Sequence, residues 1–288
     1  MKSDEANSPE DVYEEVKDDD GISRGLYKFN IGSKDKDKES NEDIIKMKWI
    51  TNYPLPLLAC LVKTKSMEAE TGTVKTSYRL ELVRFENKEL GKIMTLNFDS
   101  KVTDYDCVNI EPSVLLLTVI EDGRLKAYSL GIKEAYEGKP DSVVMEPTFE
   151  SAKHRNQYCL VRILPAAEKN MIVCSDFNCN IHVFKLTAET VDPFAKPSLV
   201  IFNSHAKLIT DMLFLTIPIP SSESPNQVES YQHYLASCSL DGYLKIWNFE
   251  DNFKPIYELF SSKKWLFGMS FDMTTLILYC NGEGKHFP

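Results

Sequence analysis

One pattern recurs along this chain: a short run of β-branched and aromatic residues that ends in a large aromatic side chain. The aromatic residues of the five runs are Phe29, Phe85, Tyr128, Phe184 and Trp247. Three of them follow a turn pair by six residues, namely Asp122-Gly123, Asn178-Cys179 and Asp241-Gly242. Asp and Asn hydrogen-bond locally in tight turns, and Gly tolerates the positive φ that such turns need. The pattern therefore predicts a strand, a tight turn and a second strand in each unit.

Further apolar runs flank these turns. Around the turn at 241–242, "LITDMLFL" (208–215) and "HYLASCS" (233–239) come before it, and "PIYELF" (255–260) follows the aromatic residue. Each unit thus supplies four short strands, and the aromatic residues recur every 43 to 63 positions. Such a period is typical of a β-propeller with four-stranded antiparallel blades, in which each blade covers its neighbours. No long segment has the period of a helix, so we predict an all-β fold.

The predicted domain limits follow from these units. Residues 1–21 hold much of the formal net charge of −10 and few apolar side chains, so we expect a flexible acidic segment there. Residues 22–288 are predicted to form the propeller. Its blades are expected at 44–99, 102–149, 158–203 and 208–261, with a mixed or incomplete blade made by 22–33 and 265–287. Two inserts, 64–76 and 218–230, are expected to be exposed, mobile loops of unassigned role.

Composition excludes several classes of protein. The longest nearly continuous apolar run, 54–62, is about half of what a membrane-spanning helix needs, and the chain begins with acidic residues. Secretion and membrane insertion are therefore not expected. No stripe of lysine and arginine interleaved with aromatic residues occurs, so direct binding to nucleic acid is not expected either.

The seven cysteines are odd in number, and none belongs to a CxxC pair or a set of histidine partners. This usage fits buried reduced thiols better than a disulfide framework or a zinc site. We therefore predict a cytoplasmic protein, with the nucleus as the alternative, and no metal or other cofactor.

The clearest unit, 204–249, resembles the WD-repeat family. It contains "SH" (204–205), "LASCSLDG" (235–242) and "LKIWN" (244–248) in the order of that family. The resemblance implies that a hydrogen-bonded set pins the blade, and its members are His205, Ser237, Asp241 and Trp247. Other units keep fragments of the set, namely Thr118, Asp122 and Tyr128 in one and Asn178 and Phe184 in another. Because five-bladed members are uncommon, a fragment of a seven-bladed protein is favoured over five blades closed by the two chain ends.

The order of motifs over 24–285 also resembles a narrower family, the diphthine methyl esterases of diphthamide biosynthesis. Its best-matching pieces are "IIKMKW" (44–49), 235–247 and the segment that follows at Trp265. This resemblance implies hydrolysis of a methyl ester on a modified histidine of elongation factor 2, with no metal required. A base or polarising group near the central channel would serve.

The catalytic candidates for that reaction are His154, Asp176 and Asp241. The alternative for His154 is a loop histidine at a blade junction, and for Asp176 a solvated turn residue. His182 alternates inside a strand and is interpreted as a packing residue.

The residues Ser237, His205 and Asp241 are also the types that a serine hydrolase uses. A nucleophilic serine needs an adjacent base and an oxyanion hole, usually on a strained turn such as GxSxG, and Ser237 lacks that frame. We therefore interpret these residues as structural. The alternative to an esterase is a non-catalytic scaffold that binds other proteins in a multi-subunit complex, since the propeller fold does not itself imply catalysis.

Overall fold

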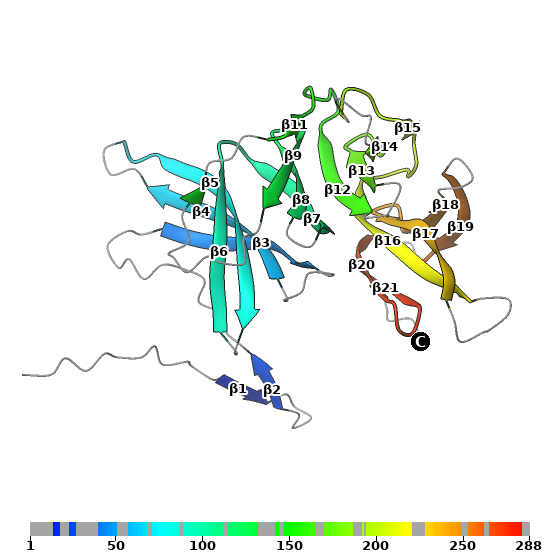
Figure 1. The fold of residues 1–288 in the computed structure, drawn as a ribbon, viewed down its shortest axis with the longest axis horizontal. Coiled ribbons are helices and arrows are strands. Elements are labelled where there is room, and N and C mark those ends of the chain that lie inside the picture. Colours follow the sequence, from blue (N-terminus) through cyan, green and yellow to red (C-terminus); the bar gives the residue numbers. More distant parts are fainter. Residues whose placement is uncertain are drawn as a thin grey trace, which may run out of the picture.

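Strands make up all the regular secondary structure that the computed structural model describes (Figure 1). The described residues are 14–17, 23–26, 40–50, 57–67, 71–86, 89–111, 114–131, 142–143, 147–164, 170–186, 192, 194–220, 228–248, 253–261 and 265–283. Within these ranges no helix occurs, and hence none that could cross a membrane. The predicted all-β class is confirmed.

Four sheets of antiparallel strands follow one another along the chain. The first contains β3 (Ser40–Ile50), β4 (Leu57–Met67), β5 (Val74–Glu86) and β6 (Glu89–Phe98), and the short β10 (Ser142–Val143) adds to it in parallel beside β6. The second contains β7 (Val102–Glu111), β8 (Val114–Glu121), β9 (Arg124–Gly131) and β11 (Phe149–Glu150). The third contains β12 (Tyr158–Leu164), β13 (Asn170–Asp176), β14 (Ile181–Leu186) and β15 (Leu199–Ile201). The fourth contains β16 (Ile209–Pro220), β17 (Val228–Ser239), β18 (Tyr243–Asn248) and β19 (Lys254–Phe260).

The first strands of successive sheets contact one another in the order β3, β7, β12, β16 and β20 (Leu266–Asp272). β20 pairs with β21 (Ile277–Gly282) in a sheet of two strands. Figure 1 shows the sheets side by side, from the sheet of β3–β6 to that of β16–β19. The predicted four-stranded antiparallel unit is thus present in a blade-like arrangement.

Each of these five strands contains a β-bulge, which lies near the start of every one of them except β3. The pairing register shifts between Ile44 and Lys46, Val102 and Asp104, Tyr158 and Leu160, Ile209 and Asp211, and Leu266 and Gly268. A bulge adds one residue to a strand and re-aims the side chain beside it. The recurrence of this irregularity at one position indicates that the five sheets are equivalent units.

The hydrophobic cores lie between neighbouring sheets. One core joins the first and second sheets, another the second and third, and a third the third and fourth. The repeated aromatic residues Tyr128, Phe184 and Trp247 belong to these three cores in turn, and each is almost fully buried. The aromatic position that recurs in the sequence therefore marks where a sheet packs on the one before it.

The predicted tight turns are confirmed by their backbone. Asp122 and Gly123 both have positive φ, at 48° and 75°, between β8 and β9. Gly242 has φ of 83° between β17 and β18, and Cys179 has φ of 63° at the corresponding turn of the third sheet. An Asp-Gly pair suits this geometry because a positive φ costs these two residues less free energy than it costs residues with bulky side chains.

The described residues at the two ends of the chain pair separately. In the described residues, β1 (Glu14–Lys17) pairs with β2 (Ser23–Leu26), and β20 pairs only with β21. No pairing joins 22–33 with 265–287 there, and 27–33, with the aromatic Phe29, lie outside the described part. Of the acidic segment 1–21, the structure describes only the four residues of β1.

The described residues of the two inserts are mostly strand. Met67 pairs with Val74, so 64–67 and 74–76 lengthen β4 and β5 as one hairpin. Pro218 pairs with Tyr231 in the same way, and 221–227 lie outside the described residues. The expectation of loops is wrong for these paired residues, because the hydrogen-bond ladder continues past the covered part of each sheet.

Candidate functional site

The four residues of the predicted pinning set are hydrogen-bonded to one another. The His205 ring stands in the loop before β16, and its Nε2 lies 2.8 Å from Ser237 Oγ on β17. The indole Nε1 of Trp247, on β18, donates to the same oxygen at 2.9 Å. His205 Nδ1 lies 3.1 Å from Asp241 Oδ2 in the β17–β18 turn. With the His205 proton on Nδ1, donors and acceptors match from the indole through the hydroxyl and imidazole to the carboxylate.

Burial limits what this set can do chemically. Ser237, His205 and Trp247 are all buried, and the serine oxygen is shared by the imidazole and the indole. A nucleophilic hydroxyl must instead face a substrate and an oxyanion hole. The arrangement therefore fits a structural role, in which hydrogen bonds hold the loop before β16 and the β17–β18 turn against β17 and β18.

Asp241 takes part in this hydrogen-bonded set as a carboxylate anion. Burial by itself would raise the pKa of Asp241, but the hydrogen bond from His205 and those from the backbone amides of Tyr243 and Ala206 lower it to about 2. Those amides donate to Asp241 at 2.9 and 2.8 Å respectively. The candidate Asp241 therefore belongs to the blade pin and not to the group that contains His154.

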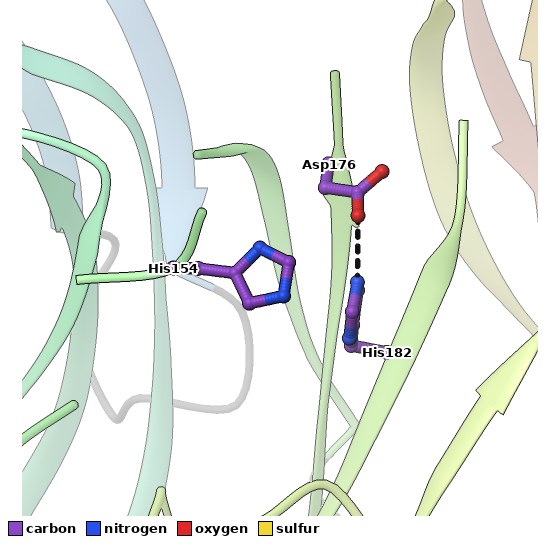
Figure 2. Close-up of side chains that lie close together, drawn as sticks. All are labelled: His154, Asp176 and His182. Atoms are coloured by element: carbon purple, nitrogen blue, oxygen red, sulfur yellow. Dashed lines mark hydrogen bonds and ion pairs between the residues drawn. The ribbon is translucent and has the colours of Figure 1, made fainter. Parts of the chain in front are cut away.

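The other two catalytic candidates lie together in the third sheet. Figure 2 shows His154, from the loop before β12, beside Asp176 at the end of β13 and His182 on β14. His182 Nε2 lies 2.9 Å from Asp176 Oδ2, and the two imidazole centroids are 4.8 Å apart. His154 also stacks on Tyr158, with centroids 4.7 Å apart. The alternative of a solvated Asp176 is wrong, because its exposed fraction is 0%.

Charge and proton positions within this group follow from its hydrogen bonds. Burial would raise the pKa of Asp176, but hydrogen bonds from His182 and Asn180 lower it to about 2. Burial and the nearby His182 lower the pKa of His154. The backbone amide of Asn156 donates to His154 Nδ1 at 3.3 Å, so a neutral His154 ring carries its proton on Nε2. In that tautomer Nε2 donates a proton and does not act as a base.

The group has the ligand types of a transition-metal site. Its two imidazoles and one carboxylate offer ligand atoms that all lie within 4.8 Å of one another. The carboxylate of Asp176 is already occupied, however. Oδ1 accepts the amides of Asn178 and Asn180, and Oδ2 accepts the Asn180 side chain as well as His182. A metal ion would have to displace these donors and the Nε2 proton of His154.

The second sheet contains an equivalent of the Asp176–His182 pair. Glu121 lies opposite the first residue of β7, as Asp176 lies opposite the first residue of β12. Lys126 on β9 lies opposite the residue two positions before Glu121 on β8. In the same way, His182 on β14 lies opposite the residue two positions before Asp176 on β13. Lys126 Nζ lies 2.9 Å from Glu121 Oε2. A recurring acid–base pair at one blade position indicates a structural role for Asp176 and His182.

The fragments of the pinning set in the second sheet do not form such a set. Thr118 Oγ1 is buried with no hydrogen-bond partner. Asp122 instead binds Lys153 at 2.8 Å on the surface. The set that the resemblance implies is not formed here, because Thr118 stands one position before the residue that corresponds to Ser237. The side chain of Thr118 therefore points to the other face of the strand.

A buried ion network across the first strands was not foreseen from the sequence. Arg162 on β12 donates to Asp104 on β7 at 2.8 Å and to Asp211 on β16. Lys46 of β3 binds Asp104, and Lys48 of β3 binds Asp106, which is two residues further along β7. The available signal was "VTD" (102–104) and "ITD" (209–211), which place an aspartate directly after the bulge.

The same aspartates also bind backbone amides of the following sheet. Asp104 accepts the amide of Val161 at 2.9 Å, and Asp211 accepts that of Met269 at 2.9 Å. Burial would raise the pKa of Asp104, but Arg162 and Lys46 lower it. Each bulge aspartate thus links its own first strand to the next one.

Comparison with known proteins gives no family for the chain: no family model matches it, and no curated protein matches it.

Proposed function

We propose that this protein is a non-catalytic platform that binds another protein through the exposed face of β20 and β21. We call this face the terminal apolar surface and define it by Trp265, Phe267, Ile277 and Tyr279. Their exposed fractions are 48%, 48%, 47% and 55%. Single exposed apolar residues are ordinary on a protein surface, but aromatic residues grouped on neighbouring strands are typical of interaction sites.

The position of this surface in the array supports the proposal. β7, β12 and β16 each make extensive contact with a first strand on both sides, whereas the extensive contact of β20 with a described first strand is the one with β16. Leu266 is buried against the fourth sheet, with Met269 and Leu278 packed beside it. Trp265 and Phe267 flank the buried Leu266, and Ile277 and Tyr279 flank the inward Leu278, so the four side chains face away from the fourth sheet.

The same contacts indicate the kind of partner. Every core described above forms between the apolar faces of two sheets. A partner that continues this packing offers a β-sheet with an apolar face. The surface contains no charged side chain among its four defining residues, so the partner face is expected to be uncharged as well.

Site-specific crosslinking tests this function. A photo-crosslinking residue at position 267 of the full chain should capture one protein in cells, whereas the same residue at position 71, on the exposed hairpin tip, should not. The captured protein is then purified and titrated against the chain by calorimetry. Trp265→Ser should weaken that binding at least tenfold. Equal crosslinking at both positions, capture of a second copy of the chain, or unchanged affinity of Trp265→Ser would contradict the proposal.

A second candidate function is hydrolysis of the methyl ester of methylated diphthine on elongation factor 2. Its support is the motif order of the sequence together with the contact between His154 and the buried Asp176–His182 pair. The half-buried His154 ring is the group of the three that a substrate could reach. It would act as a proton donor from Nε2.

This candidate has a direct test. Purified chain is incubated with methylated elongation factor 2, and mass spectrometry follows the loss of the methyl group. Activity should fall at least a hundredfold in His154→Ala and stay unchanged in Lys153→Ala, the neighbouring exposed residue. Absence of demethylation by folded wild-type chain would remove this candidate.

A further inference from the structure

We propose that the outer face of β3 is a docking surface for a partner protein that presents a β-strand with an acidic side chain. We call this face the β3 surface and define it by Ile45, Met47 and Trp49, whose exposed fractions are 45%, 57% and 52%. β3 is the edge strand of its sheet, and its extensive contact with a described first strand is the one with β7. The β3 surface lies at the opposite end of the array from the terminal apolar surface, so this inference does not depend on the proposed function.

The register of the bulges shows what the β3 surface corresponds to in the other sheets. Met47 is the second residue after the register shift of β3. The residues at this position in β7, β12 and β16 are Tyr105, Val161 and Met212. Each of these three is fully buried in the core that its sheet forms with the preceding one. Met47 is instead exposed, so the β3 surface is the face on which a preceding sheet would pack.

The contacts that the bulge aspartates make with the next first strand have basic counterparts. Lys46 of β3 donates to the carbonyl of Tyr105 at 3.2 Å, and Arg162 of β12 donates to that of Met212 at 2.6 Å. In all four contacts a charged side chain binds the backbone of the second residue after the register shift in the next first strand. Both backbone groups of a residue in an antiparallel pair point to the same side of the strand, so those of Met47 point away from β4, toward the free edge of β3.

The sign of the charge alternates from one first strand to the next. The series is Lys46 in β3, Asp104 in β7, Arg162 in β12 and Asp211 in β16, and each member pairs with its neighbour. Within the described residues, Arg162 thus binds an acid on both sides, whereas Lys46 binds an acid on one side and is still 28% exposed. By this alternation the strand that packs against β3 carries an acid. Its carboxylate would accept the amide of Met47 and lie beside Lys46, as Asp104 lies beside Arg162.

Two occupants from the chain itself do not match the β3 surface. A second copy that packs through β20 would place Gly268 and Ser270 at the positions that correspond to Asp104 and Arg162, and neither of these side chains is charged. Residues 1–21 are acidic but hold few apolar side chains, so they match the charge beside the β3 surface and not its apolar part. The occupant that matches both is a separate protein with an apolar sheet face and an acidic residue on the strand that meets β3.

Site-specific crosslinking in cells identifies the partner and the strand that it presents. A photo-crosslinking residue replaces Met47 of the full chain. In the matched control it replaces Met67, an exposed apolar residue of the same sheet on the β4–β5 hairpin. Position 47 should capture one protein that position 67 does not capture, and the crosslinked peptide should be a β-strand that contains an aspartate or a glutamate. Capture of no protein, of residues 1–21, of a second copy of the chain, or of a peptide without an acidic residue would overturn the proposal.

Affinity measurements then test the apolar and the charged contact separately. The captured protein is purified and titrated against the full chain by calorimetry. Trp49→Ser should weaken the binding at least tenfold, whereas Met67→Ser should leave it unchanged. Both positions are exposed, so both variants should fold, which circular dichroism checks. Replacement of the partner's acidic residue by the corresponding amide should also weaken the binding at least tenfold, because a charge-assisted hydrogen bond would be lost. An unchanged affinity of Trp49→Ser, or of the amide variant of the partner, would contradict the proposal.

Discussion

Arg162 Nη1 lies 2.8 Å from Asp104 Oδ2, and this ion pair joins β12 to the first strand of the preceding sheet. The same guanidinium also binds Asp211 of the following sheet. Three consecutive sheets are therefore connected through one arginine whose side chain is 13% exposed. Removal of one partner from a buried ion pair leaves an uncompensated charge, which costs far more than the loss of a surface pair.

We expect Arg162→Met to destabilise the fold by about 3 kcal/mol, because Asp104 and Asp211 would stay buried with less positive charge nearby. Urea unfolding followed by intrinsic fluorescence measures the change in midpoint. The matched control is Arg124→Met, which removes an exposed pair with Glu150 and should cost less than about 1 kcal/mol. Equal midpoints for the two variants would show that the network does not stabilise the sheets.

Replacement of Ser237 tests the blade pin. Ser237→Ala removes the oxygen that Trp247 and His205 share, and it leaves two buried polar atoms without partners. A loss of about 2 kcal/mol follows from the usual cost of such groups. Ser230→Ala, at an exposed position of the same strand, should be nearly neutral. A Ser237→Ala variant as stable as wild type would contradict the structural role.

Acid should destabilise the fold in part through Asp241. Its pKa is lowered to about 2 in the folded chain, below the ordinary 3.8. A depressed pKa stabilises the fold above the unfolded value, and this contribution is lost as pH falls from about 4 to about 2. The difference corresponds to about 2 kcal/mol. Asp241→Asn should flatten the plot of urea midpoint against pH in that window, and an unchanged slope would refute the assignment.

The Asp176–His182 pair of the third sheet should tolerate the type of acid–base pair that the second sheet contains. His182→Lys recreates the Glu121–Lys126 arrangement beside Asp176, so we expect a change within about 1 kcal/mol of wild type. His182→Leu removes a hydrogen bond to the buried carboxylate and should cost about 2 kcal/mol. Thermal unfolding compares the two variants. A lysine variant no more stable than the leucine variant would contradict the equivalence of the two pairs.

The residues that were predictable are those whose role is local. Gly123 and Gly242 occupy turns with positive φ, and turn chemistry is readable from an Asp-Gly pair. Trp247 recurs with the other aromatic residues at a fixed offset from its turn, and His205 and Ser237 fall in a familiar order around it. The class of the fold was also predictable, because short β-branched and aromatic runs are separated by turn residues and no long segment has the period of a helix.

Contacts between sheets were decided by the tertiary structure. Arg162 lies 58 residues from Asp104 and 49 residues from Asp211 in the sequence. The burial of Asp176 beside His154 depends likewise on how one loop folds over a strand end. The sequence alone determined strands, turns and the side chains that face a core, because these depend on neighbours along the chain. Which charged side chains meet depended on bulges and on the stacking of one sheet upon the next, and only the folded chain sets those distances.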